Sequence, residues 1–408
     1  MGDQTAPIVI VGAGHAGGAA AALLRQYGWR GPITLIGAEP HLPYQRPPLS
    51  KAWLKGETVA ASLLLRPVSF YAANAIDLIL SQRATHIDRA ARCVVLQSGA
   101  RIAWHRLILA LGSTVRTLDL PGITLGGVLT LRDIANAEAL KAALRPGARL
   151  AVIGGGYIGL EVAASARALG ADVVVLERED RLLARVASPP LAAFFRQHHA
   201  QRGVNVQTGA HIESLEGKHG TISGVRVADG RLCACDVALI GVGAAANDSL
   251  ARDAGLECDG GILVDHATHT SDPAIYAVGD CTRRPLGTMR MRLESVPNAL
   301  EMAKQAAADI CGRPPPAPEV PWFWSDQYEI RLQIAGLRDG AVECVTRGDP
   351  RTASFAIWHL AGDGTVLSVE AVNAPADFMA AKALIAGRRR VMPAALADPS
   401  RSLRELAA

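Results

Sequence analysis

PIVIVGAGHAGGAAAALLRQYG, residues 7–28, is the stretch that decides the fold. An apolar run typical of a buried strand leads into a glycine-rich turn, and an Ala/Leu-rich helix follows and ends on a glycine. In such a unit Gly12 permits a tight turn, Gly14 lets the backbone approach a pyrophosphate, and Gly17 allows helix and strand to pack closely. The free N–H groups at the start of the helix favour a phosphate. The stretch therefore predicts a dinucleotide-binding βαβ unit.

The same pattern occurs a second time in the chain. Residues 149–170, RLAVIGGGYIGLEVAASARALG, align with the first copy without a gap. The glycines of this second turn are Gly154, Gly156 and Gly159. A further apolar strand follows each copy, at residues 33–37 and 173–177. A single glycine-rich turn can serve packing alone, but two copies in the required strand–turn–helix context predict two bound dinucleotides.

An acidic residue follows the second strand of each copy. Glu39 and Glu177 are both placed to accept a hydrogen bond from a ribose hydroxyl. A carboxylate at Glu177 repels a 2′-phosphate, so the second site is predicted to prefer NADH over NADPH. The neighbouring Arg178 leaves some use of NADPH open.

Composition places the chain among globular proteins. Its 408 residues are 50% hydrophobic and 20% charged, enough for two or three domains with their own cores. A net charge of +4 does not argue for nucleic acid, and no apolar run approaches the ~20 residues of a membrane-spanning helix. The polar start MGDQTAP lacks the features of a signal peptide. Seven scattered cysteines without a framework spacing indicate reduced thiols and a cytoplasmic protein.

The second half of the chain ends in a separate region. A helix is expected over Asn298–Cys311, and the proline-rich segment 312–321 then reads as a stiff linker. Beyond it, alternating strand patterns and a late helix over Asp377–Ile385 predict a small α+β domain.

Several longer segments resemble a known family. The segment at 270–280 is similar to the second FAD motif of flavoprotein reductases with two dinucleotide-binding domains. Further segments resemble the ferredoxin reductases of bacterial cytochrome P450 and ring-hydroxylating oxygenase systems, the putidaredoxin reductase type. These segments are HLPYQRPPLSKAWL (41–54), MRLESVPNALEMA (291–303) and PWFWSDQY (321–328). The resemblance covers nearly the whole chain.

The resemblance implies a set of binding residues for each dinucleotide. The implied FAD residues are Gly12, Gly14, Ala16, Gly17, Glu39, Pro48, Lys51, Arg132, Gly279, Asp280 and Val296. The implied NADH residues are Gly154, Gly156, Ile158, Gly159, Glu161, Glu177 and Gly241.

The resemblance also implies three catalytic residues. Pro48 and Trp324 would flank the isoalloxazine ring, although Trp324 could instead be a core residue of the C-terminal domain. Lys51 would lie near flavin N5 and pair with Glu161, which the family directs toward the nicotinamide. The alternative for this pair is a structural salt bridge without a kinetic role.

A redox disulfide is missing from the sequence. Neither C-x-x-C nor C-x4-C occurs, and the closest pair, Cys233 and Cys235, has no suitable bonding geometry in a strand. Cys281, beside the second FAD motif, reads as a small packing residue. Electrons must therefore leave the flavin directly, and a one-electron carrier such as a [2Fe-2S] ferredoxin fits that output. The chain has no cysteine spacing for a cluster, so the cluster belongs to a partner, and no metal site is predicted.

These observations predict an α/β fold with two doubly wound domains of the glutathione-reductase type. The expected domains are an FAD domain (1–115 and 245–320), an NAD domain (116–244) and a C-terminal interface domain (321–408). The expected function is that of a monomeric NADH-dependent ferredoxin reductase that supplies an oxygenase. Two alternatives stay open: an NADH oxidase or quinone reductase on the same fold, and a non-enzymatic flavoprotein that acts by binding partners.

An acidic ferredoxin is the partner that the resemblance implies. It is expected to dock by charge on a basic rim around the flavin edge. The candidate residues for this rim are Arg66, Arg290, Arg292, Lys304 and Arg388–Arg390. For any one of them, ordinary solvated surface is the competing interpretation.

Overall fold

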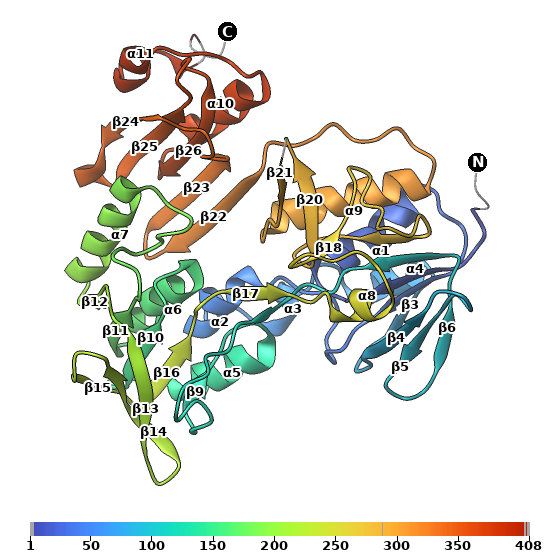
Figure 1. The fold of residues 1–408 in the computed structure, drawn as a ribbon, viewed down its shortest axis with the longest axis horizontal. Coiled ribbons are helices and arrows are strands. Elements are labelled where there is room, and N and C mark those ends of the chain that lie inside the picture. The colour runs from blue at the N-terminus through green and yellow to red at the C-terminus, as the bar shows by residue number, and fades with distance from the viewer. Residues whose placement is uncertain (1–3, 288, 404, 406–408) are drawn as a thin grey trace. The chain divides into compact units, whose positions relative to one another are not determined.

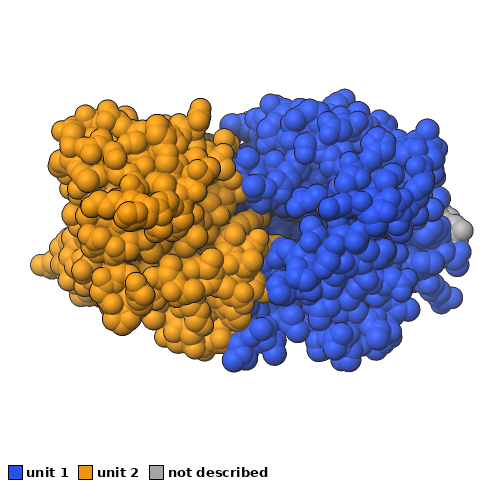
Figure 2. All heavy atoms as spheres, turned by 90° about the horizontal axis from the view of Figure 1, so that it is seen from below, with its two compact units in different colours: residues 1–45, 59–114, 244–319 blue, residues 46–58, 115–243, 320–408 orange. Residues whose placement is uncertain are grey.

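The computed structural model describes residues 4–287, 289–403 and 405. They form two compact units, coloured separately in Figure 2. Unit 1 consists of the chain up to Gln45, Val59–Thr114 and Ala244–Glu319. Unit 2 consists of Arg46–Thr58, Val115–Gly243 and the chain from Val320 onward.

Unit 1 contains a five-stranded parallel sheet in the order β19-β7-β1-β2-β3. Its strands are β1 (Ile8–Val11), β2 (Ile33–Ile36), β3 (Ile76–Ile79), β7 (Arg106–Leu109) and β19 (Ile275–Ala277). All four residues of β1 are buried, as expected for the centre of a parallel sheet covered on both faces. The predicted strand–turn–helix unit is therefore present, with β1 followed by α1 (His15–Gln26).

Helix α9 (Val296–Ile310) packs against α1. Ala20 and Ala21 of α1 and Ala303 and Ala306 of α9 are all fully buried, and such small side chains let two helices approach closely. The helix expected at Asn298 starts two residues earlier, because Ser295 caps it by accepting the N–H of Asn298.

The remaining elements of unit 1 are short. An antiparallel sheet contains β4 (Ala84–Asp88), β5 (Cys93–Leu96) and β6 (Arg101–Ala103). A second small sheet contains β18 (Ile262–Leu263), β20 (Thr282–Leu286) and β21 (Met289–Met291). The other elements are α3 (Ala60–Leu63), α4 (Val68–Ala73), β17 (Ala244–Ala246) and α8 (Ser249–Asp253), and β8 (Ser113–Val115) lies at the boundary of the unit.

Unit 2 repeats the architecture with a parallel sheet in the order β12-β11-β10-β16-β9. Its strands are β9 (Val128–Leu129), β10 (Arg149–Ile153), β11 (Asp172–Leu176), β12 (Asn205–Gln207) and β16 (Val237–Ile240). Its helices are α2 (Ala52–Lys55), α5 (Ile134–Ala143), α6 (Tyr157–Ala168) and α7 (Pro189–Gln201), with a 3-10 turn η1 (Pro47–Ser50). A small antiparallel sheet is formed by β13 (Ile212–Lys218), β14 (Thr221–Val227) and β15 (Leu232–Ala234).

The C-terminal part of unit 2 is an antiparallel sheet in the order β22-β23-β26-β25-β24 (Figure 1). The strands are β22 (Trp322–Gln327), β23 (Ile330–Gly336), β24 (Glu343–Asp349), β25 (Ser354–Leu360) and β26 (Val366–Val372). The turn η2 (Pro350–Thr352) joins two of them, and α10 (Pro375–Ala386) and α11 (Pro393–Ala397) follow. The late helix extends beyond the expected Asp377–Ile385, since Pro375 is well suited to a first helical turn.

The two doubly wound sheets and the small α+β C-terminal part confirm the fold class predicted from the repeat. No helix within the described ranges is both long and apolar enough to cross a membrane.

Candidate functional site

The first glycine turn of unit 1 is shaped by close backbone approaches. Gly12 has a φ of +114°, which favours glycine, and a Cβ atom there would lie 2.1 Å from the carbonyl oxygen of Ala110. A Cβ on Gly17 would lie 1.9 Å from the carbonyl oxygen of Gly12. At Gly14 a Cβ would meet nothing within 4 Å, so the open side of the turn is the side on which a pyrophosphate fits.

A cavity of about 390 Å³ lies at the carboxyl ends of β1 and β2. Val11, Gly12, Ile36 and Ala38 contribute to its lining. In open parallel sheets, ligands bind at the carboxyl ends of the strands. The cavity therefore has the place expected for part of a dinucleotide, and polar side chains such as Gln82, Asn247 and Asp253 complete its lining.

Glu39 follows β2 and is half-buried. One of its carboxylate oxygens accepts a hydrogen bond from the hydroxyl of Tyr44 at 2.6 Å. The contact limits the freedom of the carboxylate, and a carboxylate has about four acceptor sites, so it can also accept a ribose hydroxyl.

The second FAD motif lies in the same unit. Gly279 has a φ of +80°, and Asp280 accepts a hydrogen bond from the Ser113 hydroxyl at 3.2 Å. Val296 is the first residue of α9 and is half-buried. Ala16 is buried at the start of α1, and the nearest atom to a Cβ on Gly279 would be the Ala16 Cβ at 3.1 Å. Unit 1 thus brings the first glycine turn and the second motif together.

The second glycine turn, in unit 2, has the same construction. Gly154 has a φ of +108°, and a Cβ on Gly159 would lie 2.4 Å from the carbonyl oxygen of Gly154. Gly156 has open space where its side chain would be. Gly241 donates its N–H to the carbonyl of Ile153 at 2.8 Å, which fixes the neighbouring strand end.

Glu177 lies against this second turn. Its Oε2 accepts the N–H of Gly155 at 2.6 Å, and its Oε1 accepts the N–H of Glu179 at 2.8 Å. Each oxygen retains acceptor capacity, because a carboxylate has about four acceptor sites. Arg178 is exposed and pairs with Glu179, which also holds the pKa of the Arg178 guanidinium above its usual range. Ile158 is 47% exposed at the start of α6, so an apolar side chain is available to a ligand there.

Lys51 and Glu161 form the salt bridge that the resemblance implies. The Lys51 ammonium lies 2.6 Å from Glu161 Oε2, and the Glu161 side chain is only 3% exposed. Ser50 donates a further hydrogen bond to Oε2 at 2.6 Å, and Ser325 donates one to Oε1 at 2.7 Å. Lys51 also donates to the carbonyl of Pro47 at 3.0 Å. Helix α6, turn η1 and strand β22 thus converge on one carboxylate.

Three further predicted flavin contacts, Pro48, Arg132 and Trp324, belong to unit 2. Pro48 is half-buried within η1. The backbone N–H of Arg132 donates to Asn136 at 3.1 Å, and its carbonyl accepts from Arg46 at 2.8 Å. Trp324 is half-buried on β22, and its ring lies 5.6 Å from that of Trp322.

Trp322, rather than Trp324, is attached to the core of the C-terminal sheet. Its ring contacts the buried Phe378 at a centroid distance of 5.6 Å, and it packs on the apolar cluster of that domain. The Trp324 ring is tilted by 34° to that of Trp322. A contact between Trp324 and a ligand stays a prediction.

The cysteines offer no disulfide exchange chemistry. All seven carry free thiols. Cys281 is fully buried, and burial raises the pKa of its thiol to about 12. Burial likewise raises the pKa of Cys235 to about 12. A thiol that stays protonated is a poor nucleophile, so these residues act in packing.

Metal-ligating side chains are dispersed over the described part of the chain, where no group of three or more could hold an ion. His198 and His199 both lie on α7, and the lowered pKa of each imidazole is caused mainly by burial. His199 is hydrogen-bonded to Gln327 at 2.8 Å.

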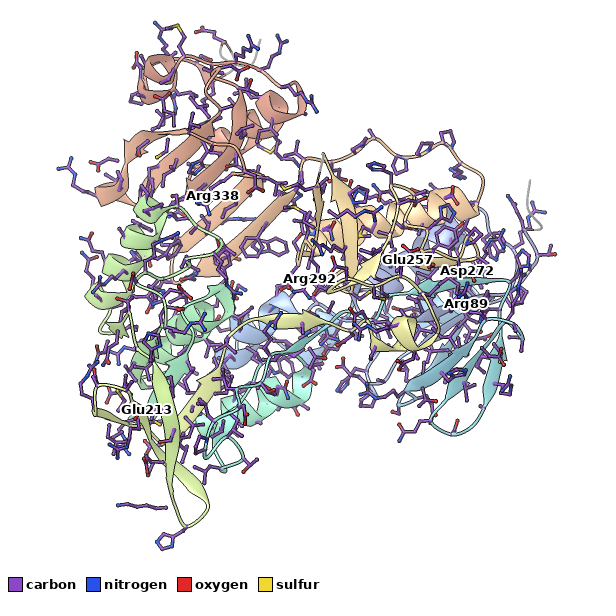
Figure 3. The ribbon with its side chains drawn as sticks, in the orientation of Figure 1. Arg89, Glu213, Glu257, Asp272, Arg292 and Arg338 are labelled. Atoms are coloured by element: carbon purple, nitrogen blue, oxygen red, sulfur yellow. The ribbon has the colours of Figure 1, made fainter. Side chains whose placement is uncertain are left out.

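Several residues of the expected basic rim already have acidic neighbours. Lys304 pairs with Glu319 at 2.9 Å, and Arg292, labelled in Figure 3, pairs with Glu294. Arg390 pairs with Asp363 at 2.8 Å. These contacts reduce the positive charge that Lys304, Arg292 and Arg390 offer to a partner.

Sequence reasoning missed Ser50 and Ser325 as members of the site. Each lies beside a residue that was identified, Lys51 or Trp324, and each is a polar residue in a segment rich in apolar ones. Their contacts with Glu161 join residues 111 and 164 positions apart, so only the folded chain shows them.

Two families match the chain. Residues 6–303 match the pyridine nucleotide-disulphide oxidoreductase family, and residues 322–407 match the reductase C-terminal family. A probable ferredoxin reductase, CtmF, from Castellaniella defragrans is 48% identical over 96% of both chains. Putidaredoxin reductase CamA from Pseudomonas putida is 41% identical, over 98% of this chain and 96% of its own.

Solved structures of two reductases of this kind are also similar to this chain. The covalent putidaredoxin reductase–putidaredoxin complex matches with a TM-score of 0.96 and 40% identity, over 99% of this chain and 98% of that one. The ferredoxin reductase for the CYP199A2 system of Rhodopseudomonas palustris matches with the same score and identity, over 99% of this chain and 100% of that one.

Proposed function

Because the chain belongs to the pyridine nucleotide-disulphide oxidoreductase family, we propose a specific route for electrons through its residues. The protein is a flavoprotein reductase of the ferredoxin reductase type, which uses FAD and NAD(H). FAD accepts a hydride from NADH as a pair of electrons and can release the electrons singly. The observation that carries the proposal is the pair of glycine turns combined with cysteines that cannot act as a redox pair.

The binding roles follow from the two turns. The turn at Gly12 and Gly14, with Asp280 and Glu39, would hold FAD in unit 1. The turn at Gly154 and Gly156 would hold NADH in unit 2. Each turn ends in a helix whose first N–H groups and dipole favour a pyrophosphate. Glu177 would accept from the adenosine ribose and disfavour a 2′-phosphate, which supports a preference for NADH.

Lys51 and Glu161 would fix the geometry of hydride transfer. Both are tied down by several hydrogen bonds, and hydride transfer depends mainly on the distance and alignment of the reacting atoms. Pro48 and Trp324 would contact the flavin ring, and Arg132 the rest of the cofactor. These roles do not require a proton-transfer base.

The electrons would then leave for a [2Fe-2S] ferredoxin. The seven cysteines form no disulfide, and the thiol of Cys281, beside the second FAD motif, is buried with a raised pKa, so an outside carrier is needed. An acidic ferredoxin would meet exposed arginines, among which Arg388 and Arg389 follow α10. The free thiols support a reducing environment such as the cytoplasm, and a monomer is the state that we propose.

The experiment that tests the function compares electron acceptors. The FAD-loaded protein is reduced with NADH in a stopped-flow instrument and then mixed with a [2Fe-2S] ferredoxin, with oxygen, or with a quinone. Rapid, saturable reoxidation by ferredoxin is expected. Faster reoxidation by oxygen or quinone would favour an oxidase or quinone reductase, and a flavin that NADH does not reduce would favour a non-enzymatic role.

A further inference from the structure

A chain of hydrogen bonds runs through unit 2 from Glu161 to Tyr328. Ser325 Oγ donates to Glu161 Oε1 at 2.7 Å, and Gln327 Nε2 donates to Ser325 Oγ at 3.2 Å. Gln327 Oε1 lies 2.8 Å from His199 Nε2. The Tyr328 hydroxyl lies 3.4 Å from His199 Nδ1. The chain thus joins helix α6, strand β22 and helix α7.

The residues of this hydrogen-bond chain are almost completely buried. Glu161 is 3% exposed, Ser325 0%, Gln327 1% and His199 0%. In such surroundings a polar group without a partner is costly, and hydrogen bonds in series strengthen one another. A buried chain of this kind holds its members in one arrangement.

The direction of the chain follows from the single proton on Ser325. The carboxylate of Glu161 is paired with the Lys51 ammonium and can only accept, so the Ser325 proton must point to it. Ser325 can then only accept from Gln327, which turns the amide NH₂ to Ser325 and the amide oxygen to His199. His199 must therefore carry its proton on Nε2 and accept the Tyr328 hydroxyl on Nδ1.

The surroundings of His199 agree with a neutral imidazole. Burial lowers the pKa of His199 to about 4, so the ring carries one proton near pH 7. Every donor in the chain consequently points toward Glu161. The two oxygens of that carboxylate accept hydrogen bonds from different partners. Oε1 accepts from Ser325, and Oε2 accepts from Ser50 and Lys51.

We propose that Ser325, oriented by Gln327 and His199, is a positioning residue that fixes the Glu161 carboxylate for hydride transfer. The proposal rests on the proposed function, in which Glu161 orients the nicotinamide. It gives the C-terminal domain a part in the first half-reaction: through β22 it supplies the donor that prevents the carboxylate from rotating. A small displacement of a positioning group can slow transfer by as much as ~100-fold without weakening binding.

The central test compares two buried serines of the same sheet. Ser325→Ala removes the donor to Glu161, whereas Ser368→Ala removes a fully buried hydroxyl on β26 that has no hydrogen-bond partner among the described residues. In FAD-loaded protein, Ser325→Ala should lower the limiting rate of flavin reduction by NADH about tenfold, with the dissociation constant of NADH unchanged. Ser368→Ala should leave both values unchanged. Ser325→Cys, whose thiol is a weaker donor of similar size, should fall between Ser325→Ala and the unaltered protein.

A second measurement tests the direction of the hydrogen-bond chain without measuring enzyme activity. Nitrogen-15 NMR of histidine-labelled protein, with His199 assigned from a His199→Asn variant, should show Nε2 protonated and Nδ1 unprotonated. Gln327→Met, which cuts the chain one link further away, should slow flavin reduction less than Ser325→Ala does.

Distinct outcomes overturn the proposal. A His199 ring protonated on Nδ1 would contradict the chain's direction. An unchanged rate in Ser325→Ala, while Glu161→Ala is slow, would show that the carboxylate needs no such support. Equal losses in Ser325→Ala and Ser368→Ala would reduce the effect to general destabilisation. If the unaltered protein itself were not reduced by NADH, the proposed function would fail, independently of these variants.

Discussion

The carboxylate of Glu177 accepts the backbone N–H of Gly155 at 2.6 Å, so it lies directly on the second glycine turn. A charged group in this position both stabilises the loop and sets the potential where the adenosine ribose would bind. A 2′-phosphate would approach this carboxylate closely, and two like charges at ~4 Å repel by about 4 kcal/mol at an effective dielectric constant of ~20.

We predict that Glu177→Gln raises the ratio of kcat/KM for NADPH to that for NADH by about tenfold, equivalent to ~1.4 kcal/mol. The amide oxygen can still accept the Gly155 N–H, whereas the amide NH₂ cannot accept the N–H of Glu179, so the contact with the glycine turn is kept and the contact with Glu179 is lost. Steady-state kinetics with both nucleotides measures the ratio. Asp172→Asn, which removes a charge at the other end of β11, is the matched control and should leave the ratio unchanged. Equal use of both nucleotides by the unaltered protein would contradict the assignment.

The Lys51–Glu161 pair gives a second prediction. Glu161→Ala should slow flavin reduction by NADH by roughly 10- to 100-fold while FAD stays bound, since the geometry at the nicotinamide is lost. Stopped-flow absorbance at the flavin band measures the rate, and the bound-flavin ratio measures retention.

Glu370→Gln provides the control for that experiment. Glu370 is another fully buried carboxylate of unit 2, where it accepts hydrogen bonds from Ser188 and lies 3.2 Å from His359 Nε2. Glu370→Gln should lower the free energy of unfolding without changing the rate of flavin reduction by NADH. If Glu161→Ala reduced its flavin at the normal rate, the pair would be a structural salt bridge only.

The parts of the fold that depend on local sequence could be predicted. The turn at Gly12 and its repeat at Gly154 were identified correctly because glycine is needed there for steric reasons that a few neighbouring residues determine. Helix α9 was predicted, but its first residue was not, because its start depends on the Ser295 cap. Caps shift helix ends by one or two residues without changing the apolar pattern.

The site was predictable only in part, for the same physical reason. The partnership of Lys51 and Glu161 was inferred from two motifs, and their contact confirms it. Ser50, Ser325 and Gln327 were not inferred, because a serine or glutamine has no distinctive local pattern. Their importance arises from partners on other elements, which hydrophobic periodicity does not encode.

Charge at the surface leads to a third prediction. Arg388 is exposed, whereas the Lys304 ammonium is paired with Glu319. Arg388→Glu should therefore raise the KM for ferredoxin more than Lys304→Glu does, by a few-fold at low salt. Ferredoxin-dependent turnover should also fall as salt rises and the Debye length drops below ~10 Å, while reduction by NADH should change much less. Turnover that is flat in salt, or no effect of Arg388→Glu, would rule out docking by charge at this position.

Acid sensitivity of unit 2 is the fourth prediction, and it follows from His199. Burial lowers the pKa of this imidazole to about 4 in the folded chain, against an ordinary value of about 6.5. Between these two pH values the unfolded chain binds more protons than the folded chain. The contribution of His199 to the free energy of unfolding is therefore fully present above pH ~6.5 and is lost as the pH falls toward ~4. At pH ~5 the loss amounts to about 2 kcal/mol of the free energy of unfolding.

Urea denaturation at pH 7 and pH 5, followed by circular dichroism, measures this loss. In His199→Gln the acid-induced loss should become smaller by the contribution of His199, because glutamine does not titrate, while the buried His198 keeps its own contribution. His211→Gln, at an exposed position, should keep the pH dependence of the unaltered protein. The same pH dependence in His199→Gln as in the unaltered protein would show that another group binds the protons, and the neutral imidazole assigned to His199 would then lose its support.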